Sequence, residues 1–269
     1  MAKEISVPKV NIPMDRIFIA EKDIYQETEA KARERFGKNS QAYKTTMNGI
    51  NPNNGTGSQF FFNTEVGLHL PKNQRVILFE DLERILSSPE ANEFFDGSFY
   101  IDTPELILRT EIPTYEKNKH ILKDLVKQIK DERLYFSSES PLRISGLELI
   151  KDDNPQNKYG ILLKISQDTK TTNDERFGYQ KNTIQIGNKE KILYTKTNGL
   201  SGVPLSRYGY LNSDDDNLAG SNDNGRVGIL DAEGVVASEN LEQAEKDYKK
   251  LKKDIERRKK DLISKIQKL

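Results

Sequence analysis

The chain has 269 residues and equal numbers of acidic and basic side chains, 42 of each, so its formal net charge is zero. This balance excludes a global basic field that would attract nucleic acid, and we expect no nucleic-acid partner. Cysteine is absent, which excludes disulfides, thiolate metal sites and a thiol nucleophile.

The first residues, MAKEISVPKVNIP, contain no apolar core of signal-peptide length. No run in the sequence reaches the ~20 apolar residues that a membrane span requires. We therefore expect a soluble protein without an export signal, with the cytoplasm as its default location and no membrane span.

Residues 1–74 have little regular pattern and are predicted to form an N-terminal extension, partly packed on the core. A charged helix is expected at 23–36, ended by Gly37. Residues 51–57 are rich in Asn, Gly and Pro, which is turn chemistry. The Gly55-Thr56-Gly57 sequence lacks the third glycine and the preceding strand of a dinucleotide site. The three aromatic residues at 60–62 are expected to anchor this segment on the core.

From residue 75 the pattern becomes regular, and residues 75–236 are predicted to form the main domain. The apolar run 76–79 is followed by helical spacing over 80–86. Two short strands are expected at 99–101 and 106–108, joined by a turn at 102–104. Thr114 is a candidate cap for a helix over 115–130, which has one apolar face.

After residue 141 the sequence is typical of β-structure. Alternating apolar and polar residues predict a strand at 143–150, and a second strand is expected at 159–165. Residues 171–181 are polar and predict a loop. A hairpin is expected over 183–195 with its turn at Gly187-Asn188, and the apolar run 227–230 predicts a buried strand.

The stretch around which the sequence is organised runs from 205 to 236. Between Arg207 and Gly225, 14 of 17 positions are Tyr, Gly, Asn, Ser or Asp, and the exceptions are Leu211, Leu218 and Ala219. We call residues 208–224 the polar stretch. Binding loops favour these residue types, because Tyr supplies rigid amphipathic contact area and the small polar residues supply adaptable hydrogen bonds. All five types are also reachable from an Asn codon by replacing its adenines.

The pattern LSR…L……NLA.SN.NGRV….AEG at about 199–236 resembles the variable region of variable proteins of diversity-generating retroelements. These elements copy a template repeat into a target gene with adenine-specific errors. The resemblance implies an α+β chain with a C-type-lectin-like fold, a mixed antiparallel sheet flanked by helices, with a variable region at about 205–236. It also implies a protein that binds a ligand, expected to be a protein target, rather than an enzyme.

Under this interpretation Leu211, Leu218 and Val227 point inward and fix the backbone while the neighbouring residues vary. Arg226 is expected to pair with Asp231 or Glu233 rather than to contact ligand. The acidic centre of the stretch favours a basic or amide-rich epitope. The predicted ligand-binding residues are Tyr208, Tyr210, Asn212, Ser213, Asp214, Asp215, Asp216, Asn217, Asn222, Asp223 and Asn224.

Two alternatives stay open. The same oxygen-rich residues could form a calcium-binding module, although neither register of the stretch fits an EF-hand loop, and we predict no metal site or cofactor. The stretch could also be a linker loop in a structural protein. The sequence contains no catalytic motif. Its only two histidines are His69 and His120, and neither belongs to a recognisable group of catalytic residues.

Residues 238–269 predict a C-terminal amphipathic helix. Leu241, Tyr248, Ile255, Leu262 and Leu269 recur every seven residues. The second core position of the heptad repeat is apolar at Ala244 and Leu251, but the later heptads have no apolar residue there. The helix could pack back on the domain or associate with a second copy as a coiled coil.

Overall fold

The computed structural model describes residues 16–87, 98–178, 183–186, 189–206 and 210–231. The helix expected at 238–269, and with it the predicted self-association, lies outside the described residues. So does Tyr208, together with Glu233.

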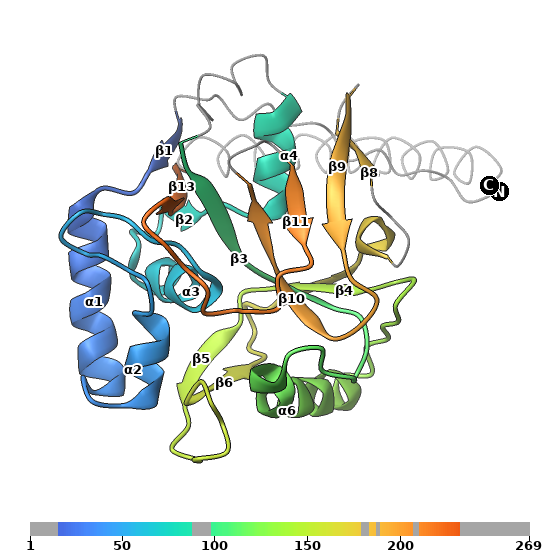
Figure 1. Ribbon diagram of the computed structural model, residues 1–269, viewed down its shortest axis with the longest axis horizontal. Coiled ribbons are helices and arrows are strands. Elements are labelled where there is room, and N and C mark those ends of the chain that lie inside the picture. The colour runs from blue at the N-terminus through green and yellow to red at the C-terminus, as the bar shows by residue number, and fades with distance from the viewer. Residues whose placement is uncertain (1–15, 88–97, 179–182, 187–188, 207–209, 232–269) are drawn as a thin grey trace, which may run out of the picture. The chain divides into compact units, whose positions relative to one another are not determined.

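The largest sheet has eight strands, seven of them in the order β7-β4-β3-β10-β11-β9-β8, while β12 pairs with β3. Among the described strands of this sheet, neighbours are antiparallel except for the parallel pairs β11–β9 and β12–β3. Figure 1 shows β3 crossing the middle of the sheet. The strands are β3 (Tyr100–Leu108), β4 (Leu142–Ser145), β7 (Lys170–Asn173), β8 (Thr183–Ile186), β9 (Lys189–Thr195), β10 (Leu200–Leu205), β11 (Leu211–Ser213) and β12 (Gly225–Arg226).

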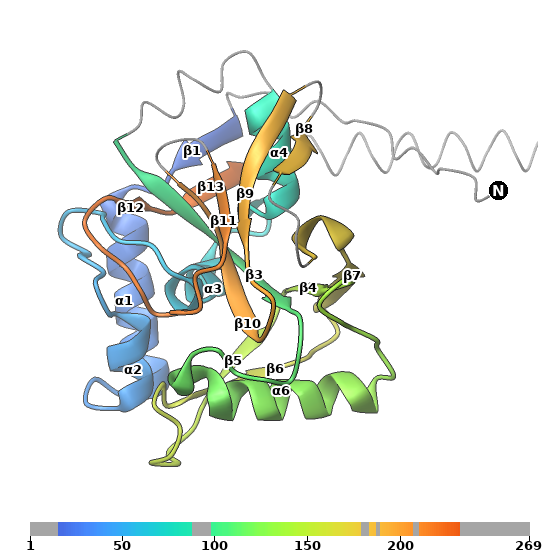
Figure 2. The same cartoon turned by 45° about the vertical axis from the view of Figure 1, so that its right-hand side comes forward.

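Two smaller sheets complete the β-structure. In the first, β13 (Gly228–Asp231) lies between β1 (Ile17–Ile19) and β2 (Gln74–Val76). Figure 2 shows β1 and β13 side by side, so the start and the end of the described chain are hydrogen-bonded to each other. In the second, β5 (Glu148–Lys151) pairs with β6 (Ile161–Lys164). The strand expected at 227–230 is confirmed, and so is the antiparallel pairing of the hairpin expected over 183–195. The turn expected at Gly187-Asn188 lies outside the described residues.

Five α-helices are described beside these sheets: α1 (Lys22–Phe36), α2 (Gln41–Thr46), α3 (Phe60–His69), α4 (Phe79–Ser87) and α6 (Lys119–Asp131). Short 3-10 helices lie at Glu116–Asn118 and Glu175–Phe177. In α6 every apolar residue of the predicted face is buried. The α+β class is confirmed, with a mixed sheet and flanking helices.

The aromatic residues at 60–62 anchor the N-terminal part as expected, but they do so from a helix that the sequence pattern did not predict. The first seven residues of α3 are all buried. Phe61 packs against Tyr159, with ring centroids 5.0 Å apart, and Phe62 packs against Tyr25 at 5.1 Å. These pairs join α3 to two apolar clusters of the protein.

Four expectations about local structure were wrong. The strand expected at 143–150 forms two strands, β4 and β5, which lie in different sheets, because Gly146 turns the chain between them with a φ of 71°. The two strands expected at 99–101 and 106–108 form one continuous strand, β3. Pro104 is tolerated within it because the register of β3 against β10 shifts between Gly202 and Pro204, where no ladder hydrogen bond is required of it. Part of the loop expected at 171–181 is the strand β7, since Thr171 and Thr172 suit a sheet edge. Thr114 does not cap α6, whose N-cap is Asn118.

Candidate binding site

The inward-facing residues of the polar stretch hold it against the core. Leu211 and Val227 are completely buried and Leu218 is 3% exposed, so the prediction that these three point inward is confirmed. Leu211 pairs with Leu205 across β10 and β11. Leu218 packs in the cluster built around α6, β3 and β4. We call Leu211, Leu218 and Val227 the frame residues.

The backbone between β11 and residue 220 is hydrogen-bonded to distant parts of the chain. Its carbonyl oxygens accept from one main-chain amide and from two asparagine side chains, of which Asn118 is buried and Asn48 is exposed. The pairs are the Gly202 amide with Asp215 at 3.0 Å, Asn118 Nδ2 with Asp216 at 2.8 Å, and Asn48 Nδ2 with Ala219 at 2.6 Å. This part of the stretch therefore follows a path set by residues outside it.

Residues 221–225 lie against the loop before α3. The Ser58 amide donates to Ser221 Oγ at 2.8 Å, and the Gly57 amide donates to the Gly225 carbonyl at 2.9 Å. The approach requires glycine, because a Cβ added at Gly225 would lie 2.4 Å from the Ser58 nitrogen. The two chain segments thus touch backbone to backbone.

Two tyrosine hydroxyls form hydrogen bonds at the C-terminal end of the polar stretch. The Tyr25 hydroxyl accepts from the Val227 amide at 3.1 Å and donates to the Gly57 carbonyl at 3.0 Å. The Tyr100 hydroxyl accepts from the Asn222 amide at 3.1 Å. Burial raises the pKa of Tyr25, and burial together with Asp102 raises the pKa of Tyr100 to about 12. Both hydroxyls therefore keep their protons at physiological pH.

A groove of about 500 Å³ lies between the polar stretch and β3. Five predicted ligand-binding residues line it: Tyr210, Asn212, Asp215, Asn222 and Asn224. Residues outside the polar stretch complete the wall, among them Tyr100, Asp102, Pro204 and Ser206. A volume of this size is in the range that small ligands or single side chains of a partner occupy.

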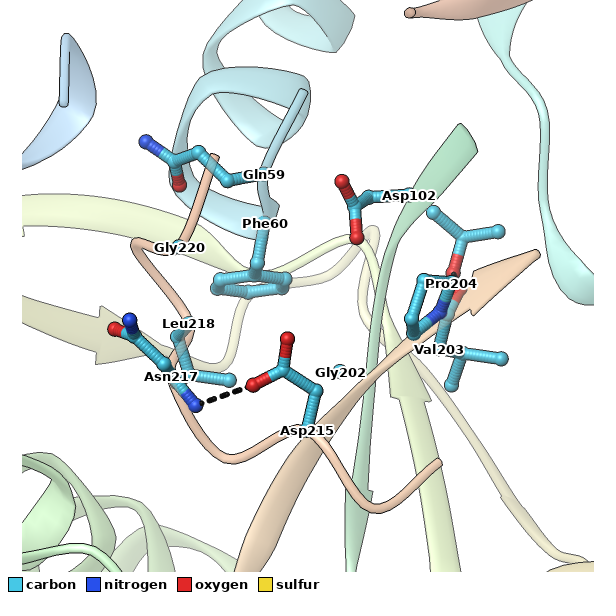
Figure 3. A pocket seen from close by; sticks show the side chains of 11 residues that line it. Gln59, Phe60, Asp102, Gly202, Val203, Pro204, Asp215, Asn217, Leu218 and Gly220 are labelled. Atoms are coloured by element: carbon cyan, nitrogen blue, oxygen red, sulfur yellow. Dashed lines mark hydrogen bonds between the residues drawn. The ribbon is translucent and has the colours of Figure 1, made fainter. Parts of the chain in front are cut away.

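The groove continues into a small, deeper cavity, drawn in Figure 3. Asp102 and Asp215 line both spaces. Figure 3 shows the two carboxylates turned toward the same space beside the ring of Phe60. Burial raises the pKa of Asp102, and the negative charge of Asp215 adds to this effect, while a hydrogen bond from Ser58 opposes it. Burial also raises the pKa of Asp215.

Ser213 is a correction to the predicted site. Its side chain is completely buried, and it therefore cannot contact a ligand on the surface. Ser213 instead accepts hydrogen bonds from Arg109 through both its hydroxyl and its carbonyl oxygen. The cause is the alternation of side chains along β11, because Leu211 faces inward and the residue two positions later faces the same way.

The other predicted residues have mixed positions. Asp216 is half-buried and forms an ion pair with Lys196 at 2.5 Å, and Asn217 lines the deeper cavity. Asp214 is half-buried and Asp223 is exposed, and neither lines the groove. Arg226 donates to the main-chain carbonyls of Asp223 and Gly225, each at 2.7 Å.

Arg109 is a residue of the site that the sequence pattern did not indicate. Its guanidinium is completely buried and donates to four residues on different elements. Burial lowers its pKa to about 10, so it remains a cation at neutral pH. Besides Ser213 on β11, its acceptors are the Phe177 carbonyl at 3.2 Å, Ser201 Oγ at 2.8 Å and Thr195 Oγ1 at 3.0 Å. Arg109 therefore fixes the start of the polar stretch to the sheet.

Tyr194 on β9 also belongs beside the groove. It is 45% exposed and packs edge to face on Tyr210, with ring centroids 4.9 Å apart. Exposed aromatic pairs of this kind are frequent at binding surfaces. The alternation of β9 in sequence predicted a strand but gave no sign of this neighbour.

Among the described residues, no group of three or more His, Cys, Asp or Glu side chains could hold a metal ion. The histidines lie away from the groove: His69 Nε2 is 3.2 Å from Glu65, and His120 Nε2 is 3.4 Å from Asp152. No helix within the described part of the chain is long and apolar enough to cross a membrane.

Comparisons of the chain with protein-family models, with curated proteins and with solved structures found no match.

Proposed function

We propose that this protein binds a macromolecular ligand, a protein target, through the groove and the exposed side chains of the polar stretch. We further propose that it is a variable protein of a diversity-generating retroelement, with a C-type-lectin-like arrangement of its mixed sheet and helices. The stretch then supplies changeable side chains, and the frame residues hold their backbone.

The observation that carries the proposal is that other parts of the chain hold the backbone of the polar stretch, while its side chains line a groove. Its carbonyl and amide groups are hydrogen-bonded to residues elsewhere in the chain, from Asn48 to Gly202. Its side chains at 210, 212, 215, 222 and 224 line a groove. A backbone held in this way allows side chains to change without refolding, which a binding surface under diversification requires.

The competing function is that of a structural protein in which the stretch is only a linker. A linker needs no backbone partners outside itself, because water can satisfy its polar groups. The contacts of Asp215, Asp216, Ala219 and Gly225 with distant residues favour the binding function.

Two libraries of the full chain, displayed on yeast, test the proposal. The first randomises the codons of Tyr210, Asn212, Asp215, Asn222 and Asn224. The second, a matched control, randomises five buried positions: Leu205, Leu211, Leu218, Val227 and Ile229. We expect most members of the first library to keep wild-type display level and protease resistance, and most of the second to lose both. Equal losses in the two libraries would contradict the proposal.

A genomic observation tests the retroelement part separately. We expect a near-copy of the DNA encoding 205–236 beside a reverse-transcriptase gene, differing only where the copy carries adenine. A fully sequenced locus without such a copy would reject the retroelement origin. The binding function would then be tested by the two libraries alone.

A further inference from the structure

Of the two carboxylates that line the groove, Asp102 lies on β3, in the middle of the sheet, whereas Asp215 lies on the polar stretch. Its backbone is fixed: the Asp102 amide donates to Ser58 Oγ at 3.2 Å, and its carbonyl accepts from Asn63 Nδ2 at 2.7 Å. Asp102 therefore stays in place whatever residues the stretch carries.

The Asp102 carboxylate has an unused acceptor. Its Oδ2 atom is buried and has no hydrogen-bond partner among the described residues. A buried carboxylate oxygen without a donor is costly, since it has lost water and gained nothing in exchange. Figure 3 shows this carboxylate turned toward the cavity that Asp215 also lines.

The charges around the groove favour a positively charged donor. Asp102 and Asp215 both line it, and among the described residues no Lys, Arg or His does. Lys196, a cation beside the stretch, already pairs with Asp216 at 2.5 Å. The rings of Tyr100 and Tyr210 also line the groove, and aromatic faces attract cations.

We infer that the groove binds an organic cation, the ammonium or guanidinium group of a lysine or arginine side chain on the ligand, between the carboxylates of Asp102 and Asp215. This inference rests on the proposed binding function and names the chemistry of its ligand. Asp102 is the fixed anchor of the pair, and Asp215 is the part that diversification could change. A calcium ion fits less well, because among the described residues no group of three or more His, Cys, Asp or Glu side chains could hold a metal ion.

The experiment uses the full chain and a pair of probes that differ only in charge. Nα-acetyl-arginine methylamide is titrated against the ¹⁵N-labelled protein by NMR, and the citrulline derivative, its neutral near-isostere, is titrated in parallel. We expect the arginine probe to shift the amides of Gly202 and Gly220, which line the deeper cavity. The citrulline probe is expected to bind about tenfold more weakly, because it lacks the charge.

Variants assign the effect to the two carboxylates. Asp102→Asn and Asp215→Asn are each expected to weaken the arginine probe about tenfold. The control Asp168→Asn makes the same charge change at an exposed residue outside the groove and should leave the affinity unchanged. Asp215 is not packed in the core, so D215N keeps the test valid even if D102N fails to fold.

Several results would overturn the inference. These are equal binding of the two probes, no shifts with either probe, unchanged affinity in both groove variants, or the same shifts produced by calcium chloride alone. The libraries described above do not depend on charge. A tolerant groove library with no preference for the arginine probe would therefore reject the cation and keep the binding function.

Discussion

The contact between Gly225 and the loop before α3 gives the sharpest prediction about how the polar stretch is held. Replacing Gly225 with alanine would place a Cβ 2.4 Å from the Ser58 nitrogen, 2.8 Å from the Tyr100 hydroxyl and 2.9 Å from the Gly57 carbonyl carbon. Ordinary contact begins at 3.4 Å, so the closest pair is short by about 1 Å.

The overlap cannot be relieved by a rotamer change, because two of the three atoms belong to backbone. Overpacking of this kind costs about 1–3 kcal/mol. If the segments separate, the hydrogen bond from the Gly57 amide to the Gly225 carbonyl is also lost, at about 1 kcal/mol. We therefore expect Gly225→Ala to lower the free energy of unfolding by about 3 kcal/mol.

Urea unfolding followed by far-UV circular dichroism measures this loss. Gly202→Ala is the matched control, because a Cβ at Gly202 would meet nothing within 4 Å and should change the stability by less than about 0.5 kcal/mol. A G225A protein as stable as G202A would refute the backbone-to-backbone contact on which the fixed path of the stretch depends.

Three further predictions concern stability. Burial raises the pKa of Asp102 above its ordinary value of 3.8, so the folded protein disfavours the carboxylate. The stability of wild type relative to Asp102→Asn should therefore be highest below pH 3.8 and fall as the pH rises toward the raised pKa, by about 1.4 kcal/mol for each pH unit crossed. Urea unfolding at several pH values measures it, and a pH-independent difference would contradict it. Leu218→Ala should cost about 3 kcal/mol in the same assay, because Leu218 is 3% exposed in the main cluster, whereas Asp223→Ala at an exposed position should cost less than about 0.5 kcal/mol. Equal losses would place Leu218 outside the core. Tyr25→Phe should cost about 2 kcal/mol, since the Val227 amide and Gly57 carbonyl lose their buried partner, and Tyr135→Phe, at a side chain 71% exposed, should be neutral. A neutral Y25F would show that the Tyr25 bridge is not needed.

Sequence periodicity predicted the elements with one apolar face. The helix α6 and the hairpin β8–β9 follow from such patterns. The helix α3 did not, because its first seven residues are all buried, and a helix without a polar face has no period to detect. Pro104 led to the division of β3, since the bulge that accommodates it depends on the register of a strand almost one hundred residues away.

The candidate site was predictable in part for the same physical reason. Composition identified the stretch whose side chains line the groove, but Ser213 required the alternation of β11 to be followed one step beyond Leu211. Asp102 and Arg109 could not be found by pattern. Both lie in or beside an apolar strand, and only the pairing of β3 with β10 and β12 brings them to the stretch.

The two ends of the polar stretch are fastened to the same part of the molecule. At one end β11 pairs with β10, which pairs with β3, and at the other end β12 pairs with β3 directly. The span between these attachments is set. An added or deleted residue would therefore move Gly225 out of a position that only glycine can fill. The two attachments therefore fix the length of the polar stretch.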